Sequence, residues 1–332
     1  MRKVLIVANV RKTQGGITTQ INELTESLIS EGIDTEVVST HGSFYERILG
    51  IKDAYVKSKQ FDVVLGVGCA YYGFVPIVIA FIISVLNNVK VVYNFHDGQV
   101  TEFIRKYLGL VKFVMNNEKV IVASEFLDSE FKKYGFNSEI INNHFNDLGN
   151  LKYKNCNTSK IGIMWARSFE KLYRVDLALE AAKNVTQSKN VDFHFYGGGS
   201  NYEYFKNKFC CDKIHFHGFK KRHDLISEYC KYQVFLNTSE YDNFPMSIVE
   251  AGLNKMVVVS SKVGGIYSIY KENEIVFFES GNLVSLMTTL NDVIENISNY
   301  ESYSQNLYNK VNSFNWMSVR EKWLNALNII NV

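Results

Sequence analysis

Short apolar runs alternate with longer amphipathic segments along the first half of the chain. The runs have the length and β-branched content of strands. They occupy residues 3–10, 34–40, 61–68, 89–95 and 118–124. Between several of them, apolar residues recur three or four positions apart, and Ile21, Leu24 and Leu28 predict a helix that ends at Gly32. This alternation predicts a parallel sheet with helices on both faces.

The same pattern begins again after a segment rich in Asn, Gly, Lys and Ser, Ile140–Lys160, which predicts an interdomain linker. Further apolar runs occupy residues 161–167, 191–199, 213–219, 232–239 and 256–261. Residues 314–330 predict a final amphipathic helix with Trp316, Trp323 and Leu327 near one face.

We therefore predict an α/β fold of two doubly wound, Rossmann-like domains that face each other across a cleft. The predicted domains are residues 1–152 and residues 153–314. Residues 315–332 form a C-terminal helix, for which a return toward the first domain is one expected arrangement.

Length and composition agree with a two-domain globular protein. The chain has 332 residues, of which 46% are hydrophobic and 21% are charged. A formal net charge of +2 does not favour a nucleic-acid partner. The five cysteines follow no metal-ligand spacing and predict reduced thiols in a cytoplasmic protein.

Three segments with apolar residues bear on the question of membrane contact. The opening MRKVLIVANV predicts a first strand rather than a signal peptide. Tyr71–Leu86 has 16 residues, fewer than the roughly 20 that span a bilayer, and contains Pro76, so we expect a buried or membrane-touching helix. Phe103–Phe113 interleaves basic and apolar residues, and two interpretations stay open: a helix packed on the sheet, or peripheral contact with a membrane through the N-terminal domain.

Parallel sheets bind ligands at the carboxyl ends of their strands, so candidate residues are sought there. Gly15 and Gly16 follow the first strand and form either a tight turn or a close approach to an anion or sugar. His96 and Asp97 follow a later strand and either hydrogen-bond a sugar, take part in proton transfer or order the loop. The stretch GVGCAYYG lacks the third glycine of a dinucleotide fingerprint, so no nicotinamide or flavin site is expected.

In the second half, Arg167, Lys171 and Arg174 lie between a strand and a helix. A guanidinium group there either binds diphosphate oxygens or belongs to a solvated basic loop. The glycine-rich turn around Gly198 lets a phosphate or sugar approach the main chain.

The stretch SEYDNFPMSIVEAGLN holds Asp242 and Glu250 on either side of Pro245. Pro245 suits the first turn of a helix, which leaves the amides of Met246 and Ser247 to meet an anion. The Glu250 carboxylate, inside that helix, suits the two vicinal hydroxyls of a ribose.

In this order and at these intervals, the motifs resemble those of the group 1 glycosyltransferases of polysaccharide and glycolipid assembly, which have the GT-B fold and use nucleotide sugars with retention. The resemblance covers nearly the whole chain. It rests on Gly15-Gly16, the His96 loop, NNHFND, Arg167, Gly197–Gly199, HFHGF, DNFPMSIVEA and KVGGI. The family's pair of acids, seven residues apart, corresponds to Asp242 and Glu250.

The resemblance implies a role for each matching residue. Glu250 would hold the donor ribose, Arg167 with Lys171 the diphosphate, and Asp242 and His96 would lie by the donor sugar. The main chain at Gly218, Phe219 and Lys220 would hold the base. The donor sugar or the diphosphate would also be held by Gly16, Gly198 and the loop residues Asn243, Phe244, Pro245, Met246 and Ser247.

Three positions depart from the family pattern. Asp242 is one methylene shorter than the usual glutamate, Tyr173 stands where a lysine is usual, and Tyr267-Ser268 replaces Pro-Glu. We expect a cytoplasmic enzyme that transfers a sugar from a UDP- or GDP-sugar to a glycan or lipid-linked acceptor, without cofactor or metal, because the chain has no Asp-x-Asp motif. The alternatives are a catalytically silent nucleotide-sugar-binding partner of an assembly complex and a sugar-nucleotide epimerase.

Overall fold

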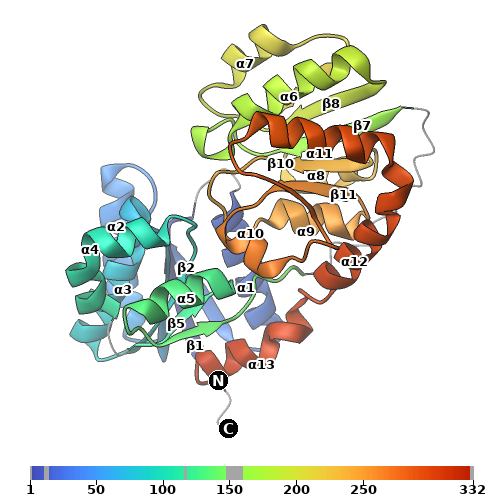
Figure 1. The fold of residues 1–332 in the computed structure, drawn as a ribbon. Coiled ribbons are helices and arrows are strands. Elements are labelled where there is room, and N and C mark those ends of the chain that lie inside the picture. Colours follow the sequence, from blue (N-terminus) through green and yellow to red (C-terminus); the bar gives the residue numbers. More distant parts are fainter. Residues whose placement is uncertain (1, 11–14, 116–117, 147–159, 330–332) are drawn as a thin grey trace. The chain divides into compact units, whose positions relative to one another are not determined.

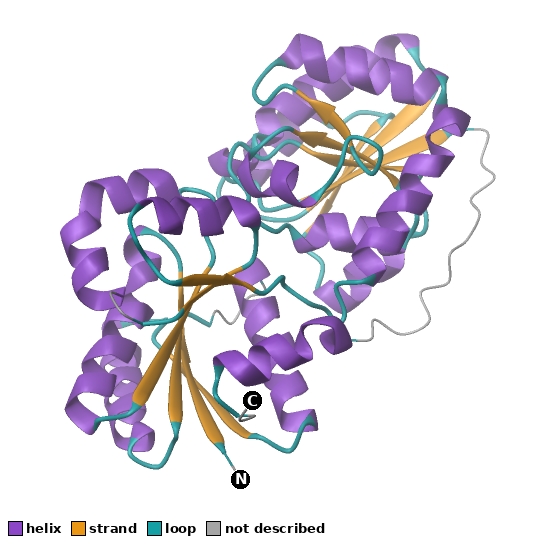
Figure 2. Ribbon diagram, turned by 60° about the horizontal axis from the view of Figure 1, so that its bottom comes forward, coloured by secondary structure: helices purple, strands orange, loops and turns teal. Residues whose placement is uncertain are grey.

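A computed structural model describes residues 2–10, 15–115, 118–146 and 160–329. The chain divides into two compact units. The first combines residues 1–147 with residues 314–332, and the second contains residues 148–313. Each unit is built on a six-stranded parallel sheet with helices packed against it (Figures 1 and 2). The predicted boundary between residues 152 and 153 lies outside the described residues.

The first sheet has the strand order β2-β1-β3-β4-β5-β6. Its strands are β1 (Lys3–Ala8), β2 (Asp34–Ser39), β3 (Val63–Gly68), β4 (Lys90–Phe95), β5 (Val120–Val122) and β6 (Ser138–Ile140). β1 and β3 are apolar along their length because both faces of a central parallel strand are covered.

Helices cover this sheet on two sides, with one hydrophobic cluster under α3, α4 and α5 and another under α1 and α13. The helices are α1 (Gly16–Ser30), α2 (Phe44–Ser58), η1 (Tyr71–Phe74), α3 (Val75–Asn87), α4 (Val100–Met115), α5 (Glu125–Lys133) and α13 (Trp316–Ala326). Ser43 begins α2 with a capping box to Glu46, and Ser124 caps α5.

The C-terminal helix α13 contributes to the core of the first unit. Trp323 and Leu327 are buried there. Just before α13, Asn315 forms an isolated parallel β-bridge with Phe145. The two chain segments that make up the first unit are therefore paired at this point.

The second sheet has the order β12-β11-β10-β7-β8-β9. Its strands are β7 (Ile161–Ala166), β8 (Val191–Tyr196), β9 (Ile214–Gly218), β10 (Val234–Asn237), β11 (Val257–Ser261) and β12 (Val276–Phe278). Its helices are η2 (Lys171–Tyr173), α6 (Val175–Ser188), α7 (Tyr202–Phe209), α8 (Arg222–Tyr229), α9 (Met246–Leu253), α10 (Gly264–Ile269), α11 (Leu283–Glu295), η3 (Ile297–Tyr300) and α12 (Glu301–Asn312).

The structure confirms the strands predicted from the apolar runs and corrects one boundary, the start of the linker. The predicted linker began at Ile140, but this residue ends β6, and Ile141 to Phe145 pack in the first unit. The rest of the predicted linker lies largely outside the described residues. The short strands β6 and β12 were not predicted, since three residues are too few to show a periodicity.

The apolar segment 71–86 forms η1 followed by α3, with Pro76 in the first turn of α3. Among the described residues, no helix combines the length and the apolarity needed to cross a membrane.

Candidate active site

The candidate site of the second unit forms where the order of its strands reverses. β7 and β10 are neighbours, but the chain continues from β7 toward β8 and from β10 toward β11. Loops that leave such neighbouring strands diverge, and the carboxyl ends of the strands stay accessible between them. Arg167 directly follows β7, and Asp242 lies in the loop after β10.

Arg167 and Asp242 form an ion pair at this point. Nη2 of Arg167 lies 2.5 Å from Oδ2 of Asp242 and 3.4 Å from Oδ1 of Asn237. Their side chains are only 15% and 14% exposed. Nε of Arg167 is buried and has no hydrogen-bond partner among the described residues, which is unusual for a charged donor. The guanidinium group therefore has donor capacity left for an anion.

Opposing effects act on the Asp242 carboxyl group. Burial raises its pKa, whereas Arg167, the Asn243 amide and the Ser239 hydroxyl each favour the charged form, and the net direction is upward. Oδ1 accepts the Asn243 amide at 2.9 Å. Both carboxylate oxygens of Asp242 are thus already engaged by the protein.

Helix α9 begins directly after this loop. The sequence placed Pro245 in the first turn, but the structure places it one position earlier, at the N-cap, because its extended ψ of 113° is not helical. Met246 and Ser247 are then the first helical residues, and their amides have no partner within the helix. The Ser247 hydroxyl is buried and has no hydrogen-bond partner among the described residues. The start of α9 thus presents unsatisfied donors, as anion sites do.

Glu250 is buried one turn further along α9. Its Oε1 accepts Nε of Arg222 at 2.9 Å, and its Oε2 accepts the Tyr229 hydroxyl at 3.0 Å. Both partners belong to α8. Each carboxylate oxygen has two acceptor sites, so the contacts fix the carboxylate and leave capacity for a diol.

The glycine-rich turn after β8 packs on the residues after β7. Gly197 has a φ of +136°, and a Cβ there would lie 1.8 Å from the Arg167 carbonyl oxygen, so only glycine fits. The carbonyl oxygen of Gly198 accepts a hydrogen bond from the Phe169 amide at 2.9 Å. The turn therefore has a structural role in holding the Arg167 loop.

The residues predicted to hold a base follow β9, next to this turn. Gly218 ends β9 with a φ of +70°, and Phe219 is 56% exposed. The ammonium group of Lys220 is paired with Glu228 at 2.8 Å. Although burial raises the pKa of Glu228, hydrogen bonds from Lys220, Lys231 and Tyr196 lower it to about 2.

The structure separates the two basic residues considered beside Arg167. Arg174 pairs with Asp176 at 3.0 Å, so its charge is engaged. Lys171 is exposed, and its ammonium group has no ion pair among the described residues. Tyr173, at the position of the usual lysine, lies under the guanidinium group of Arg167, 5.2 Å from carbon to ring centre. Of the two, Lys171 is the one left to approach a ligand.

In the first unit, the glycine pair lies at the start of α1. Gly15 is the N-cap and Gly16 the first helical residue, and a Cβ on either would meet no atom within 4 Å. Open space at a helix N-terminus agrees with the interpretation as a ligand approach.

His96 and Asp97 have different surroundings. Both oxygens of Asp97 accept backbone amides, from Ala70 at 2.9 Å and from Gln99 at 2.8 Å, so Asp97 orders the loop before α4. Burial lowers the pKa of His96 to about 4, so its ring is neutral at pH 7. His96 is thus suited to neutral hydrogen bonding rather than to carrying a positive charge.

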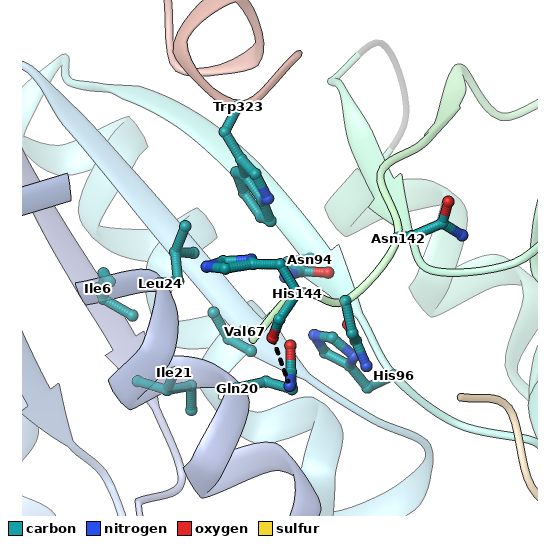
Figure 3. A pocket seen from close by; sticks show the side chains of 11 residues that line it. Ile6, Gln20, Ile21, Leu24, Val67, Asn94, His96, Asn142, His144 and Trp323 are labelled. Atoms are coloured by element: carbon teal, nitrogen blue, oxygen red, sulfur yellow. Dashed lines mark hydrogen bonds between the residues drawn. The ribbon is translucent and has the colours of Figure 1, made fainter. Parts of the chain in front are cut away.

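His96 also lines a small internal cavity of the first unit (Figure 3). The cavity has a volume of about 10 Å³, the size of one water molecule, and cannot hold a sugar. His144, from the NNHFND motif, lies between Trp323 and Gln20 and hydrogen-bonds Ser27 at 3.0 Å. Burial lowers the pKa of His144 to about 4. The motif therefore packs its histidine into the first unit.

Several residues of the second-unit site were missed by the sequence analysis. Asn237 and Ser239 are fully buried and connect the Arg167 pair to β11 through Ser260. Arg222 and Tyr229 hold Glu250 from another helix. For Asn237 and Ser239, the only signal in the sequence was that an apolar strand ends in the polar residues NTS. For Arg222 and Tyr229, no local sequence pattern indicated a role in the site.

Comparison with known proteins agrees with this geometry. Residues 152–310 match the family described as Glycosyl transferases group 1. A 161-residue stretch is 26% identical to the poly(ribitol-phosphate) alpha-N-acetylglucosaminyltransferase of Staphylococcus aureus. The match covers 47% of this chain but only 33% of that enzyme, so this chain corresponds to about a third of the relative's length.

Solved structures match over nearly the whole chain. A sucrose-phosphate synthase from Thermosynechococcus elongatus superimposes with a TM-score of 0.83 at 14% identity, covering 99% of both chains. HepE of Anabaena, in complex with UDP-glucose, superimposes with a TM-score of 0.80 at 16% identity over 99% of this chain and 100% of that one. At such low identity these likenesses show the fold, which confirms the predicted two-domain Rossmann-like architecture. Residues 152–310 of this chain thus match the group 1 glycosyl transferases, and its two units have the GT-B fold.

Proposed function

We propose that the protein transfers a glycosyl unit from a nucleoside diphosphate sugar to a glycan or glycolipid acceptor, with retention of anomeric configuration and without a metal ion. The observation that carries the proposal is the buried Arg167 guanidinium group at the strand reversal. Its Nε has no hydrogen-bond partner within the described ranges of the chain. A buried cation with unused donor capacity at this position suits the diphosphate of a donor.

In the proposed transfer, negative charge develops on the diphosphate leaving group. Breaking the anomeric bond leaves negative charge on the diphosphate, and fixed donors stabilise that charge in the transition state. Arg167, the amides at the start of α9 and the Ser247 hydroxyl supply such donors, and Lys171 adds a mobile positive charge. Glu250, held by Arg222 and Tyr229, would fix the ribose and so position the anomeric carbon.

The state of Asp242 bears on how retention is reached. A covalent intermediate would need a carboxylate free to attack the anomeric carbon. Both oxygens of Asp242 are engaged, by Arg167 and by the Asn243 amide. With retention implied by the family resemblance, attack by the acceptor on the face that the diphosphate leaves is therefore our preferred route.

Similar proteins guide the choice of donor. HepE of Anabaena binds UDP-glucose, and the staphylococcal relative is named for transfer of N-acetylglucosamine to poly(ribitol-phosphate). We propose UDP-sugars as the first donors to test and GDP-sugars as the alternative.

A lipid-linked acceptor would require membrane contact, and we propose that the first unit makes it. The exposed side of α4 carries Leu110 and Phe113, the latter 71% exposed, among the basic residues Arg105, Lys106 and Lys112. Ile82, Val85 and Leu86 extend this surface over the adjacent α3. Exposed apolar side chains among basic ones suit an anionic membrane. Flotation with phosphatidylglycerol vesicles, lost in Leu110→Asp/Phe113→Asp, is expected; equal flotation of both proteins would contradict it.

A donor screen tests the transfer. The purified protein is incubated with UDP- and GDP-sugars, and release of the nucleotide is measured with and without simple acceptors. Arg167→Ala and Glu250→Ala are expected to lose most of the activity, whereas Lys208→Ala, an exposed change on α7, should keep it. Activity near that of the wild type in both site variants would overturn the assignment.

The same assay and calorimetry separate the alternatives. A silent partner of an assembly complex would release no nucleotide from any donor. An epimerase would convert the donor sugar in the absence of acceptor. Binding of neither UDP nor GDP would refute the nucleotide site itself.

A further inference from the structure

A cluster of three histidines and one aspartate lies on one face of the second sheet, outside the candidate site. His194 in β8 pairs directly with His215 in the edge strand β9. Asp192 and His217 lie two residues from these, so alternation places all four side chains on the same face. Side chains two residues apart on adjacent strands come close enough to share one ligand.

The metal-binding atoms of Asp192, His194 and His215 lie within 4.8 Å of one another. Nε2 of His215 is 3.9 Å from Oδ1 of Asp192, too far for a hydrogen bond. The rings of His194 and His215 are stacked with their centres 4.7 Å apart. The three side chains therefore converge without satisfying one another.

The Asp192 carboxylate gives a second, independent observation. Its Oδ2 is paired with Lys160 at 2.7 Å, whereas Oδ1 is buried and has no hydrogen-bond partner among the described residues. An unsatisfied buried carboxylate oxygen is costly, and in native proteins such an atom calls for an explanation such as a bound ion. This oxygen is the one that faces His215.

We propose that Asp192, His194 and His215 bind a divalent transition-metal ion, for which zinc is the natural probe. Two imidazoles and one carboxylate are a ligand set of zinc sites that retain an open position. Metal–ligand bonds of about 2.0–2.2 Å require the ligand atoms to approach to roughly 3.4 Å. The His215 and Asp192 side chains are 36% and 18% exposed, so rotation of the side chains supplies this small movement.

His217 acts as a positioning residue in this proposal. Its Nε2 lies 3.0 Å from Nδ1 of His194. If Nδ1 of His194 donates this hydrogen bond, the other ring nitrogen is left with its lone pair for the metal, as second-shell partners commonly arrange. The ring of His217 is itself stacked on Tyr196, 4.3 Å between centres.

The proposed site lies at the edge of the second sheet. β9 is an edge strand, and it leads directly to Gly218–Lys220. A metal shared by β8 and β9 would join this edge strand to the sheet. The site is separate from the proposed transfer reaction, which we still expect to proceed without a metal, and the cluster was not predicted because its ligands come from two strands.

Zinc titration of the protein without a histidine tag tests the proposal. We expect one zinc ion per chain by calorimetry, a higher Tm with zinc, and with cobalt the visible absorption of a low-coordinate site. Asp192→Asn and His215→Gln should abolish these responses, and His217→Gln should weaken binding by roughly 10–100-fold. The control His223→Ala removes a histidine that is 99% exposed and should bind as the wild type does.

Two results would overturn the proposal. One is binding of less than one zinc per chain at 100-fold excess of metal over protein. The other is equal titration of wild type, Asp192→Asn and His215→Gln. Metal-free circular dichroism of each variant establishes that it folds, and because His215 lies on an edge strand, His215→Gln provides a second variant if Asp192→Asn fails to fold. Neither result depends on whether the protein transfers sugars.

Discussion

Nη2 of Arg167 lies 2.5 Å from Oδ2 of Asp242, and the two residues come from loops after neighbouring strands. The contact places a cation and an acid at one point of the strand reversal, and no described residue accepts a hydrogen bond from Nε of the arginine. Asp242 thus orients Arg167. Although its side chain is one methylene shorter than the glutamate usual in the family, the Asp242 carboxylate contacts the guanidinium group directly.

The first prediction concerns this pair. Arg167→Ala leaves a buried carboxylate without its partner, which costs about 3–5 kcal/mol of stability. Asp242→Asn on the Arg167→Ala background should recover part of that loss, because the amide needs no cation. Urea unfolding of the two single variants and the double variant measures the coupling. Effects that simply add, to within about 0.5 kcal/mol, would show that the pair is not coupled.

The second prediction separates binding from stability at Ser247. Its hydroxyl has no hydrogen-bond partner in the part of the chain that the structure describes, so Ser247→Ala should leave Tm unchanged or raise it slightly. If this hydroxyl meets the diphosphate, affinity for UDP should fall by roughly 10–100-fold, the effect of a hydrogen bond to a charged group. Isothermal titration with UDP measures it.

Ser43→Ala is the matched control for this change. Ser43 caps α2 in the first unit, so its loss should lower stability by about 1 kcal/mol without changing UDP affinity. A Ser247→Ala protein with lower Tm and unchanged UDP affinity would instead assign the hydroxyl a purely structural role.

The sequence predicted the strands well because apolar runs bounded by polar segments are a local signal. The positions of β1 and β3 and the start of the second series at β7 all follow from it, although both predicted runs were two residues too long. Arg167 and Asp242 were predicted as site residues because each follows a strand. Their direct contact was not predicted, since it depends on β7 and β10 being neighbours although β8 and β9 lie between them in the chain.

What the sequence analysis missed depends on contacts between distant residues. Glu250 is held by Arg222 and Tyr229, 28 and 21 positions earlier, and no period along the chain connects them. Pro245 was misplaced by one residue, because a proline is compatible with both the N-cap and the first helical position. The neutral state of His96 follows from burial, which composition does not show.

The third prediction tests the glycine pair of the first unit. A Cβ on Gly16 meets no atom within 4 Å, so Gly16→Ala should fold as stably as the wild type. If a ligand approaches the amides at this helix start, the added methyl group should lower kcat/KM several-fold. Gly109→Ala on α4 has equally open space and should leave activity unchanged. Equal activity of both variants would assign Gly16 to the turn alone.

The fourth prediction concerns pH and the attachment of α13. Nε and Nη2 of Arg320 each lie 2.6 Å from a carboxylate oxygen of Glu31, and Trp316 donates to the same group at 3.0 Å. The hydrogen bonds from Arg320 and Trp316 lower the pKa of Glu31 in the folded protein. Because the charged form is favoured by folding, this stabilisation is complete above the ordinary pKa of 4.5 and is lost as pH falls through the lowered value.

Glu31→Gln should therefore lower the Tm of the first unit at pH 7, and the difference from wild type should shrink as pH falls below about 4.5. Arg320→Gln should show the same closing difference, because it removes the other half of the pair. Trp316 and Trp323 are both on α13, and with Trp165 of the second unit replaced by Phe, their fluorescence reports the unfolding of the first unit. The control Glu102→Gln removes an exposed carboxylate from α4. Its Tm should not show this pH-dependent difference from that of the wild type. A Glu31→Gln difference that stays constant from pH 7 to pH 3.5 would mean that the contact acts through packing rather than through charge.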